Sequence, residues 1–218
     1  ANLPYDPIND LVPVSQFTII PNLLAVAPTL PIHSMKDYVA YAKANPGKMN
    51  FGTTGTGTLA HLAGAWLEEL TGTKVTFIHY KGNAQGFIDL VAGRTQVSPM
   101  TTFAAQPYLK SGKVRPIAVT STQRLKQIPD VPALAETVPG LVSISWSGIV
   151  APAGTPESII RKLNAAINAE LSSGEMAATL RRLAADVRPG TPEDFAAFIA
   201  TETPKWADVV KSSGLKLE

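Results

Sequence analysis

The sequence contains no cysteine, which excludes a disulfide scaffold, a thiolate metal site and a cysteine nucleophile. It also has little excess of charge, because 19 Lys and Arg face 17 Asp and Glu and the net charge is only +2. The basic residues are scattered rather than gathered in a run, so nucleic acid is not expected as a partner. Long apolar runs are missing as well, and the stretches at 23–26 and 148–153 are far shorter than the roughly 20 residues of a membrane span.

What is present is the composition of a globular protein. The 218 residues are 45% hydrophobic and 17% charged, which suits one domain or two modest ones. The first residues, Ala1 to Pro7, show neither a basic region nor an apolar region of a signal peptide, so none is predicted there. Composition alone leaves both the cytosol and the periplasm open.

The hydrophobic periodicity predicts strands that alternate with helices of about ten residues. A helix is expected from Met35 until Asn45-Pro46-Gly47 stops it, and the remaining elements follow by range. Strands are expected at 49–51, 75–80, 95–98, 116–120 and 143–150, and further helices at 59–70, 84–92 and 103–110. This order is typical of an α/β fold with a largely parallel sheet.

The last part of the chain is predicted to be mainly helical. The pattern Gly-Thr-Pro-Glu occurs at 154–157 and again at 190–193, with Thr as the expected N-cap and Pro as the first helical residue. A helix at 176–185 and a short strand at 186–188 are expected between the two. Pro204 is expected to kink or break the final helix, because it removes a hydrogen-bond donor.

The most informative segment is the loop Gly52 to Thr58, which has three glycines in seven residues and precedes a predicted helix. The glycines allow a sharp turn, and the helix start offers unpaired N–H groups and a positive dipole end. A carboxylate or a phosphate would fit there without any Lys or Arg. The alternative is a tight turn with no ligand.

Two nucleotide-binding motifs match this loop only in part. Residues 55–60 fit G-x-G-x-x-A, but the acid expected about 20 residues later is absent from 75–83. Gly52 and Gly57 have the spacing of a phosphate-binding P-loop, but Lys is not found after them. No cofactor is therefore expected. His61, one turn into the helix, is interpreted either as an ordinary polar residue or as a neighbour of the loop's ligand.

A second loop at 80–84 repeats the order of strand end, glycine turn and helix start. Because crevices form beyond the carboxyl ends of strands, both loops could meet one ligand. Lys81 is either a solvated turn residue or a ligand contact, and Met100 and Thr101 would reach the same edge. Trp146, in a predicted strand, is either a core aromatic or a wall of the cleft.

No catalytic or metal-binding constellation is recognised. The three histidines, at positions 33, 61 and 79, lack metal-ligand spacing, and no G-x-S-x-G sequence occurs.

Four runs in fixed order carry a resemblance to a known family. They are KMNFGTTGTGTLAHLAGAWLEELTG, VTFIHYKGNAQGFIDLVAGRTQV, LKSGKVRPIAVTSTQRLKQIPDVPALAE and SWSGIVAPAGTPESIIRKLN. Together they closely resemble the Bug receptors, the extracytoplasmic solute-binding proteins of tripartite tricarboxylate transporters, and the likeness extends from Leu3 to the C-terminus. The resemblance implies a periplasmic-binding-protein-like, type II-like fold of two lobes. It further implies a periplasmic receptor without enzymatic activity that captures a small mono- or dicarboxylate and presents it to membrane subunits.

The resemblance also implies which residues lie at the ligand. The matching positions are Thr54, Gly55, Thr56, Gly57, Thr58 and His61 in the first loop and Lys81, Gly82, Asn83 and Ala84 in the second. Met100 stands where many members carry Asp, which favours a solute without an ammonium group. Thr101 and Trp146 complete the predicted ligand-binding set.

Compared with the family, this sequence lacks a starting segment that carries ligand loops of one lobe. Residues 28–148 are expected to form a complete lobe, and 1–27 with 149–218 the remnant of the other, with the first lobe incomplete. An export signal would belong to the missing start, and the incomplete lobe leaves room for a homodimer. Two other functions stay open: an enzyme that uses His61 and Tyr80 as acid and base, or an interaction fragment without a ligand.

Overall fold

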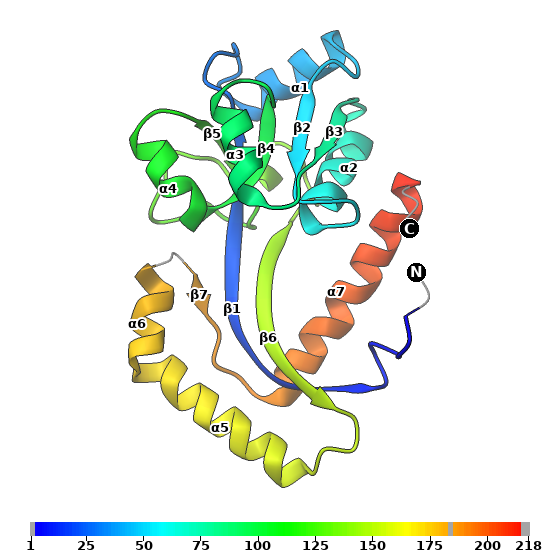
Figure 1. The fold of residues 1–218 in the computed structure, drawn as a ribbon, viewed down its shortest axis with the longest axis vertical. Helices are drawn as coiled ribbons and strands as arrows, with labels where there is room; N and C mark the ends of the chain where they lie inside the picture. The colour runs from blue at the N-terminus through cyan, green and yellow to red at the C-terminus, as the bar shows by residue number, and fades with distance from the viewer. Residues whose placement is uncertain (1–2, 183–184, 215–218) are drawn as a thin grey trace. The chain divides into compact units, whose positions relative to one another are not determined.

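The computed structural model describes residues 3–182 and 185–214, which divide into two compact units. Of these residues, unit 1 holds 3–20 and 145–208, and unit 2 holds 21–144 and 209–214. Each unit is mixed α/β (Figure 1). Within the described ranges, no helix combines the length and the hydropathy that crossing a membrane requires.

Unit 2 is built on a five-stranded sheet in the order β3-β2-β4-β1-β5. Its strands are β1 Leu11–Val26, β2 Asn50–Thr53, β3 Thr76–His79, β4 Val97–Thr101 and β5 Arg115–Val119. β2 is parallel to β3 and β4, whereas β1 is antiparallel to both β4 and β5. The expected parallel direction therefore holds for β2 to β5. β1 was not predicted, since Pro13 and Pro21 interrupt its apolar pattern and proline is unfavourable inside strands.

Helices cover both faces of this sheet. They are α1 Met35–Ala44, α2 Leu59–Thr71, α3 Asn83–Val91 and α4 Thr102–Lys110, and a 3₁₀ turn, η1, covers Leu134–Glu136. Because side chains alternate along a strand, Leu24 and Val26 of β1 pack in one hydrophobic cluster with α1 and α2. Leu23 and Ala25 pack in a second cluster with α3 and α4. The predicted helices and strands of this region are confirmed, with ends shifted by a few residues.

Unit 1 contains the first part of β1 and the strands β6 Ile144–Pro152 and β7 Asp186–Val187, both of which pair with β1. Its helices are α5 Glu157–Ser173, α6 Glu175–Arg182 and α7 Pro192–Ser213. α7 begins as expected, with the N–H of Asp194 donating to Thr191 Oγ1 at 3.1 Å. α5 begins one residue later than expected, with Pro156 as its N-cap and no side-chain cap. The expected break at Pro204 is wrong, because α7 is continuous through it.

The helix expected at 176–185 corresponds to α6, and residues 183–184 of that range lie outside the described residues. The expected lobe 28–148 differs from unit 2 at its ends. Residues 21–27 belong to unit 2 because this part of β1 pairs with β4 and β5, and residues 145–148 belong to unit 1. The last turns of α7, from Val209, also cluster with unit 2.

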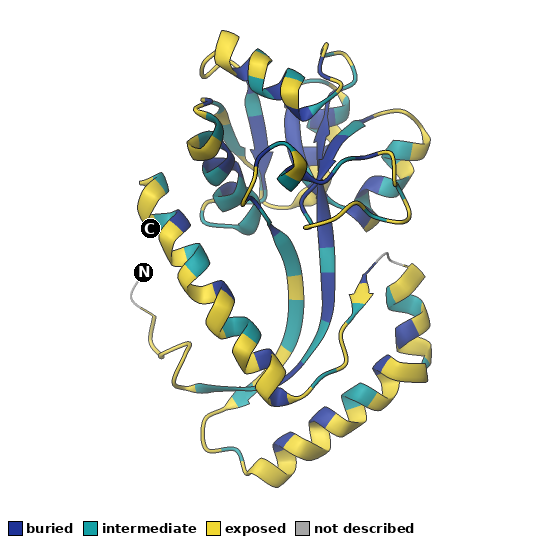
Figure 2. Cartoon of the chain, turned by 180° about the vertical axis from the view of Figure 1, so that it is seen from behind, coloured by how far each residue is buried: buried dark blue, intermediate teal, exposed yellow. Residues whose placement is uncertain are grey.

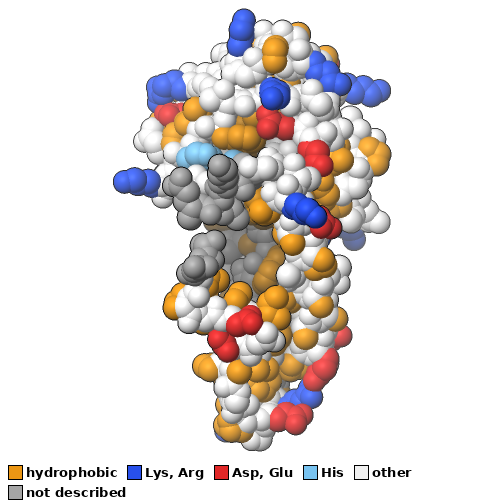
Figure 3. Space-filling view, turned by 90° about the vertical axis from the view of Figure 1, so that its right-hand side faces the viewer, with side chains coloured by type: hydrophobic (Ala, Val, Ile, Leu, Met, Phe, Trp, Pro, Cys, Tyr) orange, Lys and Arg blue, Asp and Glu red, His pale blue; other side chains and the backbone are white. Residues whose placement is uncertain are grey.

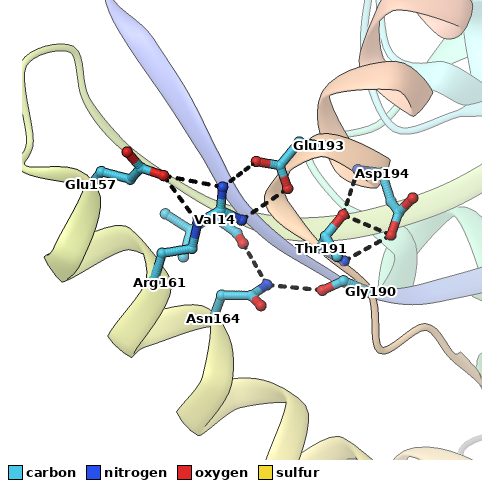
Figure 4. A network of polar contacts seen from close by, with 8 residues as sticks. All are labelled: Val14, Glu157, Arg161, Asn164, Gly190, Thr191, Glu193 and Asp194. Carbon is cyan, nitrogen blue, oxygen red and sulfur yellow. Dashed lines mark hydrogen bonds and ion pairs between the residues drawn. The ribbon is translucent and has the colours of Figure 1, made fainter.

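A polar network holds α5 to β1 and to the segment before α7 in unit 1 (Figure 4). Asn164, which is 8% exposed, donates through Nδ2 to the carbonyls of Val14 and Gly190, each at 2.9 Å. Arg161 forms ion pairs with Glu157 on its own helix and with Glu193 at the start of α7, the latter at 2.6 Å. Buried amide bonds of this kind fix the register between elements where the apolar core is small.

Candidate functional site

Three loops of unit 2 leave the sheet at the same edge. β3, β2 and β4 are neighbouring strands that run in parallel, and their last residues are His79, Thr53 and Thr101. Thr53 and His79 are direct partners in the register of β2 and β3. The loop from Gly52 to Thr58, here called the Gly/Thr loop, therefore lies beside the loop at 80–82 and the start of α4 (Figure 1). All three lie beyond the carboxyl ends of parallel strands, where ligands bind in open α/β sheets.

The Gly/Thr loop is shaped by two left-handed glycines. Gly55 has φ +134° and Gly57 has φ +72°, which residues with a Cβ rarely adopt. Thr58 Oγ1 donates to the carbonyl of Gly55 at 2.7 Å instead of capping α2. Within the described part of the chain, the N–H groups of Leu59 and Ala60 have no hydrogen-bond partner. The first turn of α2 therefore keeps free donors and the positive end of a helix dipole.

The position of α2 depends on a glycine one turn further on. A Cβ on Gly64 would lie 2.7 Å from a ring carbon of Phe77 and 2.9 Å from one of Phe51. Only glycine allows this close approach of the helix to β2 and β3, so Gly64 sets where the free N–H groups point.

His61 is buried behind the Gly/Thr loop, with a side chain that is 4% exposed. Its Nδ1 accepts the Gly57 N–H at 3.1 Å, and its ring packs against those of Phe77 and His79, with centroids 4.7 and 4.6 Å away. Burial, and secondarily the neighbouring His79, lower the pKa of His61. A neutral ring with its proton on Nε2 follows from this environment, because Nδ1 is an acceptor. The Gly57 N–H is thus already engaged by His61, while the role of Gly57 at a ligand stays a prediction.

The second loop is anchored at Tyr80 and open after it. The Tyr80 hydroxyl donates to Asp89 at 2.9 Å and lies 2.6 Å from Thr95 Oγ1, and Asp89 pairs with Arg94 at 2.5 Å. Burial is the main cause that raises the pKa of Tyr80. The hydroxyl is thus engaged in holding the strand end to α3, which makes Tyr80 a structural residue.

The residues after Tyr80 face solvent. The exposed residues are Lys81, Gly82, Asn83 and Ala84, so a ligand can reach the start of α3. Gly82 is the N-cap of α3 and supplies no side-chain cap, so the first N–H groups of this helix are free as well. The two predicted loops are therefore brought together by the parallel pairing of their strands, with the same kind of donor in each.

The remaining predicted residues lie in different surroundings. Met100 is 1% exposed and belongs to the second hydrophobic cluster, so its side chain packs in the core. Thr101 caps α4, accepting the N–H of Ala104 at 3.3 Å. Trp146 lies on β6 in unit 1, is 37% exposed and packs edge-on against Phe195 at 5.7 Å.

The charge of the site is low. Neither of the two loops, 52–58 and 80–84, contains Asp or Glu. Lys81 is the one Lys or Arg in these two loops. In the described ranges no group of three or more metal-binding side chains comes together. What this edge offers is a set of N–H donors at two helix starts, and such donors bind anions without a formal positive charge.

Sequence reasoning missed His79 and Thr53. The Nδ1 of His79 lies 2.6 Å from Thr53 Oγ1, and the His79 ring supports His61. The available signal was positional, because each of the two residues ends a strand just before a glycine-containing loop.

Known proteins match nearly the whole length of the chain. Residues 1–215 match the model of the tripartite tricarboxylate transporter family receptor. Protein BugT of Bordetella pertussis is 34% identical over 218 residues, covering 100% of this chain and 67% of BugT. A UPF0065 protein of Pseudomonas sp. strain P51 is 32% identical over 210 residues, covering 95% of this chain and 62% of that protein. The chain thus spans less than two thirds of the Pseudomonas relative.

Solved structures with similar folds include two with a named ligand. Rpa4515 of R. palustris, solved with adipate, is 34% identical to this chain with a TM-score of 0.89. The match covers 98% of this chain and 72% of the Rpa4515 chain. MatC of Rhodopseudomonas palustris, solved with bound malate, is 30% identical with a TM-score of 0.85, and the match covers 96% of this chain and 73% of the MatC chain. These relatives are binding proteins rather than enzymes, and the predicted periplasmic-binding-protein fold is confirmed. The chain belongs to the tripartite tricarboxylate transporter receptor family.

Proposed function

We propose that the receptor to which this chain belongs captures a small mono- or dicarboxylate and delivers it to the membrane subunits of a tripartite tricarboxylate transporter in the periplasm. The observation that carries the proposal is the pair of uncapped helix starts, at Leu59 and Asn83, on neighbouring loops without acidic residues. Adipate and malate, named with the two R. palustris structures, are carboxylates of the kind that such donors accept.

The ligand-binding set that we propose is the predicted one, with changes that follow from the contacts. The N–H groups of Leu59 and Ala60 are added as donors to the solute, while Gly57 and His61 shape the loop. Met100 is left out because its side chain is in the core. The exposed members of the set are Thr56, Lys81, Gly82, Asn83 and Ala84. Trp146 and Thr101 stay predictions.

An enzymatic role for His61 and Tyr80 is not proposed. The Nδ1 of His61 accepts an internal N–H, and the Tyr80 hydroxyl bonds to Asp89, so both groups are occupied in supporting the loops. A homodimer through the incomplete lobe finds no support in the comparisons and stays an untested prediction.

Proline substitution tests the N–H groups one at a time. Leu59 is the first residue of α2, and Thr58 before it is extended, with φ −71° and ψ 162°. Proline is favoured at the first position of a helix and requires an extended residue before it, and both conditions hold at position 59. Leu59→Pro should therefore remove one N–H with little effect on the helix. Loss of one charge-assisted hydrogen bond, roughly 1.5–3 kcal/mol, should weaken binding of malate or adipate about tenfold to a hundredfold in calorimetry.

The matched control is Leu59→Ala, which shortens the same side chain but keeps the N–H and should retain most of the affinity. Asn83→Pro and Asn83→Ala repeat the comparison at α3, where Gly82 is extended with ψ 174°. Equal affinities of the proline and alanine variants, with unchanged thermal melting, would show that these N–H groups do not hold the solute. Tight binding of the diamine putrescine in place of the dicarboxylates would likewise contradict the proposal.

A further inference from the structure

His79 is the last residue of β3 and lies at the edge of the candidate site. β3 is the outer strand of its sheet and has no fully buried residue, whereas the inner strands β2 and β4 are largely buried (Figure 2). His79 is exposed, and histidine side chains are visible on the surface of unit 2 in the space-filling view (Figure 3). Its ring centroid lies 4.6 Å from that of His61, whose Nδ1 holds the Gly57 N–H. The side chain of His79 therefore lies beside the Gly/Thr loop, and solvent reaches it.

A buried hydroxyl group determines which nitrogen of His79 carries the proton. Thr53 is 3% exposed, and its Oγ1 lies 2.6 Å from Nδ1 of His79. The Gly55 N–H donates to the same oxygen at 3.4 Å, so the hydroxyl group keeps its own proton to donate. Its acceptor in the described part of the chain is Nδ1 of His79, and a buried hydroxyl group without an acceptor is unfavourable. The neutral ring of His79 therefore carries its proton on Nε2.

The Nε2–H of His79 is available to a solute. Among the residues that the structure describes, the His79 side chain has Thr53 as its hydrogen-bond partner, and this contact uses Nδ1 alone. Asp89, the acidic residue of α3, is engaged elsewhere because it accepts from Tyr80 and Arg94. His79 thus adds an exposed side-chain donor to a place where the two flanking loops contain neither Asp nor Glu.

The inference rests on the carboxylate binding proposed above and deepens it. We infer that His79 contacts the solute and contributes to its specificity, with its Nε2–H donating to a carboxylate oxygen, and that Thr53 is the positioning residue that keeps this nitrogen protonated. The side-chain donor acts beside the backbone N–H groups at the starts of α2 and α3. A protonated Nε2 offers no lone pair, so the contact favours an oxygen acceptor over an ammonium group at this place.

Two substitutions of His79 separate the solute contact from the bond to Thr53. In His79→Gln the amide N–H group reaches about as far as Nε2 does, whereas in His79→Asn the amide ends at the level of Nδ1, next to Thr53. We expect both variants to bind malate or adipate more weakly than the wild type, with His79→Gln binding at least about tenfold more tightly than His79→Asn in calorimetry. Equal affinities, or the reverse order, would overturn the inference, because His79 would then act only through Thr53.

The positioning role of Thr53 has a spectroscopic readout that needs no change at His79. In long-range ¹H–¹⁵N correlation spectra at about pH 8, Nε2 of His79 should have the shift of a protonated nitrogen and Nδ1 that of an unprotonated one. Thr53→Val removes the hydroxyl group at similar shape, so both tautomers should be populated and the affinity should fall severalfold. Thr53→Ser should restore the tautomer and the affinity. A wild-type spectrum with the proton on Nδ1 would overturn the inference.

The inference and the proposed function fail in different ways. If the wild type binds malate or adipate and His79→Asn binds them equally well, the inference alone is wrong. If the wild type binds neither solute, the proposed function is wrong and the inference falls with it. His33→Asn, at an exposed position of unit 2 outside the candidate site, is the matched control and should leave the affinity unchanged. Circular dichroism checks that each variant is folded.

Discussion

A single backbone contact determines how the Gly/Thr loop is held. The Gly57 N–H donates to Nδ1 of His61, and this bond exists only while that nitrogen carries no proton. His61 is buried, and burial disfavours its charged form, in agreement with the lowered pKa. The loop conformation and the protonation state of one histidine are therefore coupled.

This coupling predicts a pH dependence of stability. The folded pKa of His61 lies below the ordinary value of 6.5, so as the pH falls through 6.5 the unfolded chain binds this proton before the folded chain does. The free energy of unfolding should therefore fall as the pH is lowered from 7.5 towards the folded pKa and lose nothing more from this group below it. Urea titrations of the wild type and of His61→Gln check this, with a flatter profile expected for the variant.

Comparing the wild type with His61→Gln separates the contribution of His61 to the pH dependence from the contributions of other groups. His79 faces His61 and contributes to its shift, while Glu68 on the same helix has a raised pKa and acts in the opposite direction. Glu136, with a pKa of about 2 beside Arg124, titrates well below this range. His33→Gln, at an exposed position, is the control. Identical pH profiles for the wild type and His61→Gln would refute the coupling.

At the scale of elements, the repeated Gly-Thr-Pro-Glu pattern gives two different helix starts. Thr191 and Asp194 cap each other reciprocally at α7, with the Thr191 N–H donating to Asp194 at 2.8 Å. Thr155 instead donates its hydroxyl to the carbonyl of Pro152, and α5 begins after Pro156 without a side-chain cap. The same four residue types thus form one complete cap and one plain turn.

Alanine substitution at the two threonines should separate these roles. Thr191→Ala removes a cap and should lower the free energy of unfolding by about 1 kcal/mol. Thr155→Ala removes only an exposed bond to a carbonyl and should cost less than about half of that. Chemical denaturation followed by circular dichroism provides both values. Equal losses at the two positions would mean that the cap at α7 stabilises the fold no more than the exposed hydrogen bond of Thr155 does.

Helices and strands whose apolar residues recur at a regular spacing could be predicted from the sequence. Contacts between these elements could not. α1 to α4 and β2 to β5 have regular apolar spacing and glycine-rich ends, which is why they were placed correctly. β1 was missed because two prolines interrupt it, although β4, β5, β6 and β7 all pair with it. The pairing of Thr53 with His79 arises from strand register, and the direction of the Gly57 N–H arises from a buried side chain. Neither is encoded in local spacing.

At the scale of the whole molecule, the two units differ in how much core they possess. The two clusters of unit 2 contain its buried strands and helices, whereas unit 1 depends on a few buried residues, such as Phe195 and Leu171, and on the network around Asn164. Fewer buried apolar contacts mean a lower free energy of local opening.

Hydrogen exchange should reveal this difference in the isolated chain. Amides in α5 and α6 are expected to exchange more than tenfold faster than those in α1 and β2 under native conditions. Peptide-resolved mass spectrometry measures both sets in one experiment. Comparable protection of the two units would show that unit 1 is stabilised by more than the contacts described above.

The passage of β1 through both units also has a consequence for synthesis. Residues 21–144 of unit 2 are contiguous, so nearly all of it can fold as soon as it has left the ribosome, while residues 3–20 of unit 1 must wait for 145–208. During that interval the first half of β1, with Val14 and Ile19, has no partner strand from its own unit. In the described residues unit 2 is thus an insertion within unit 1, and this apolar part of β1 meets its described partner strands only after β6, at Ile144–Pro152, has been made.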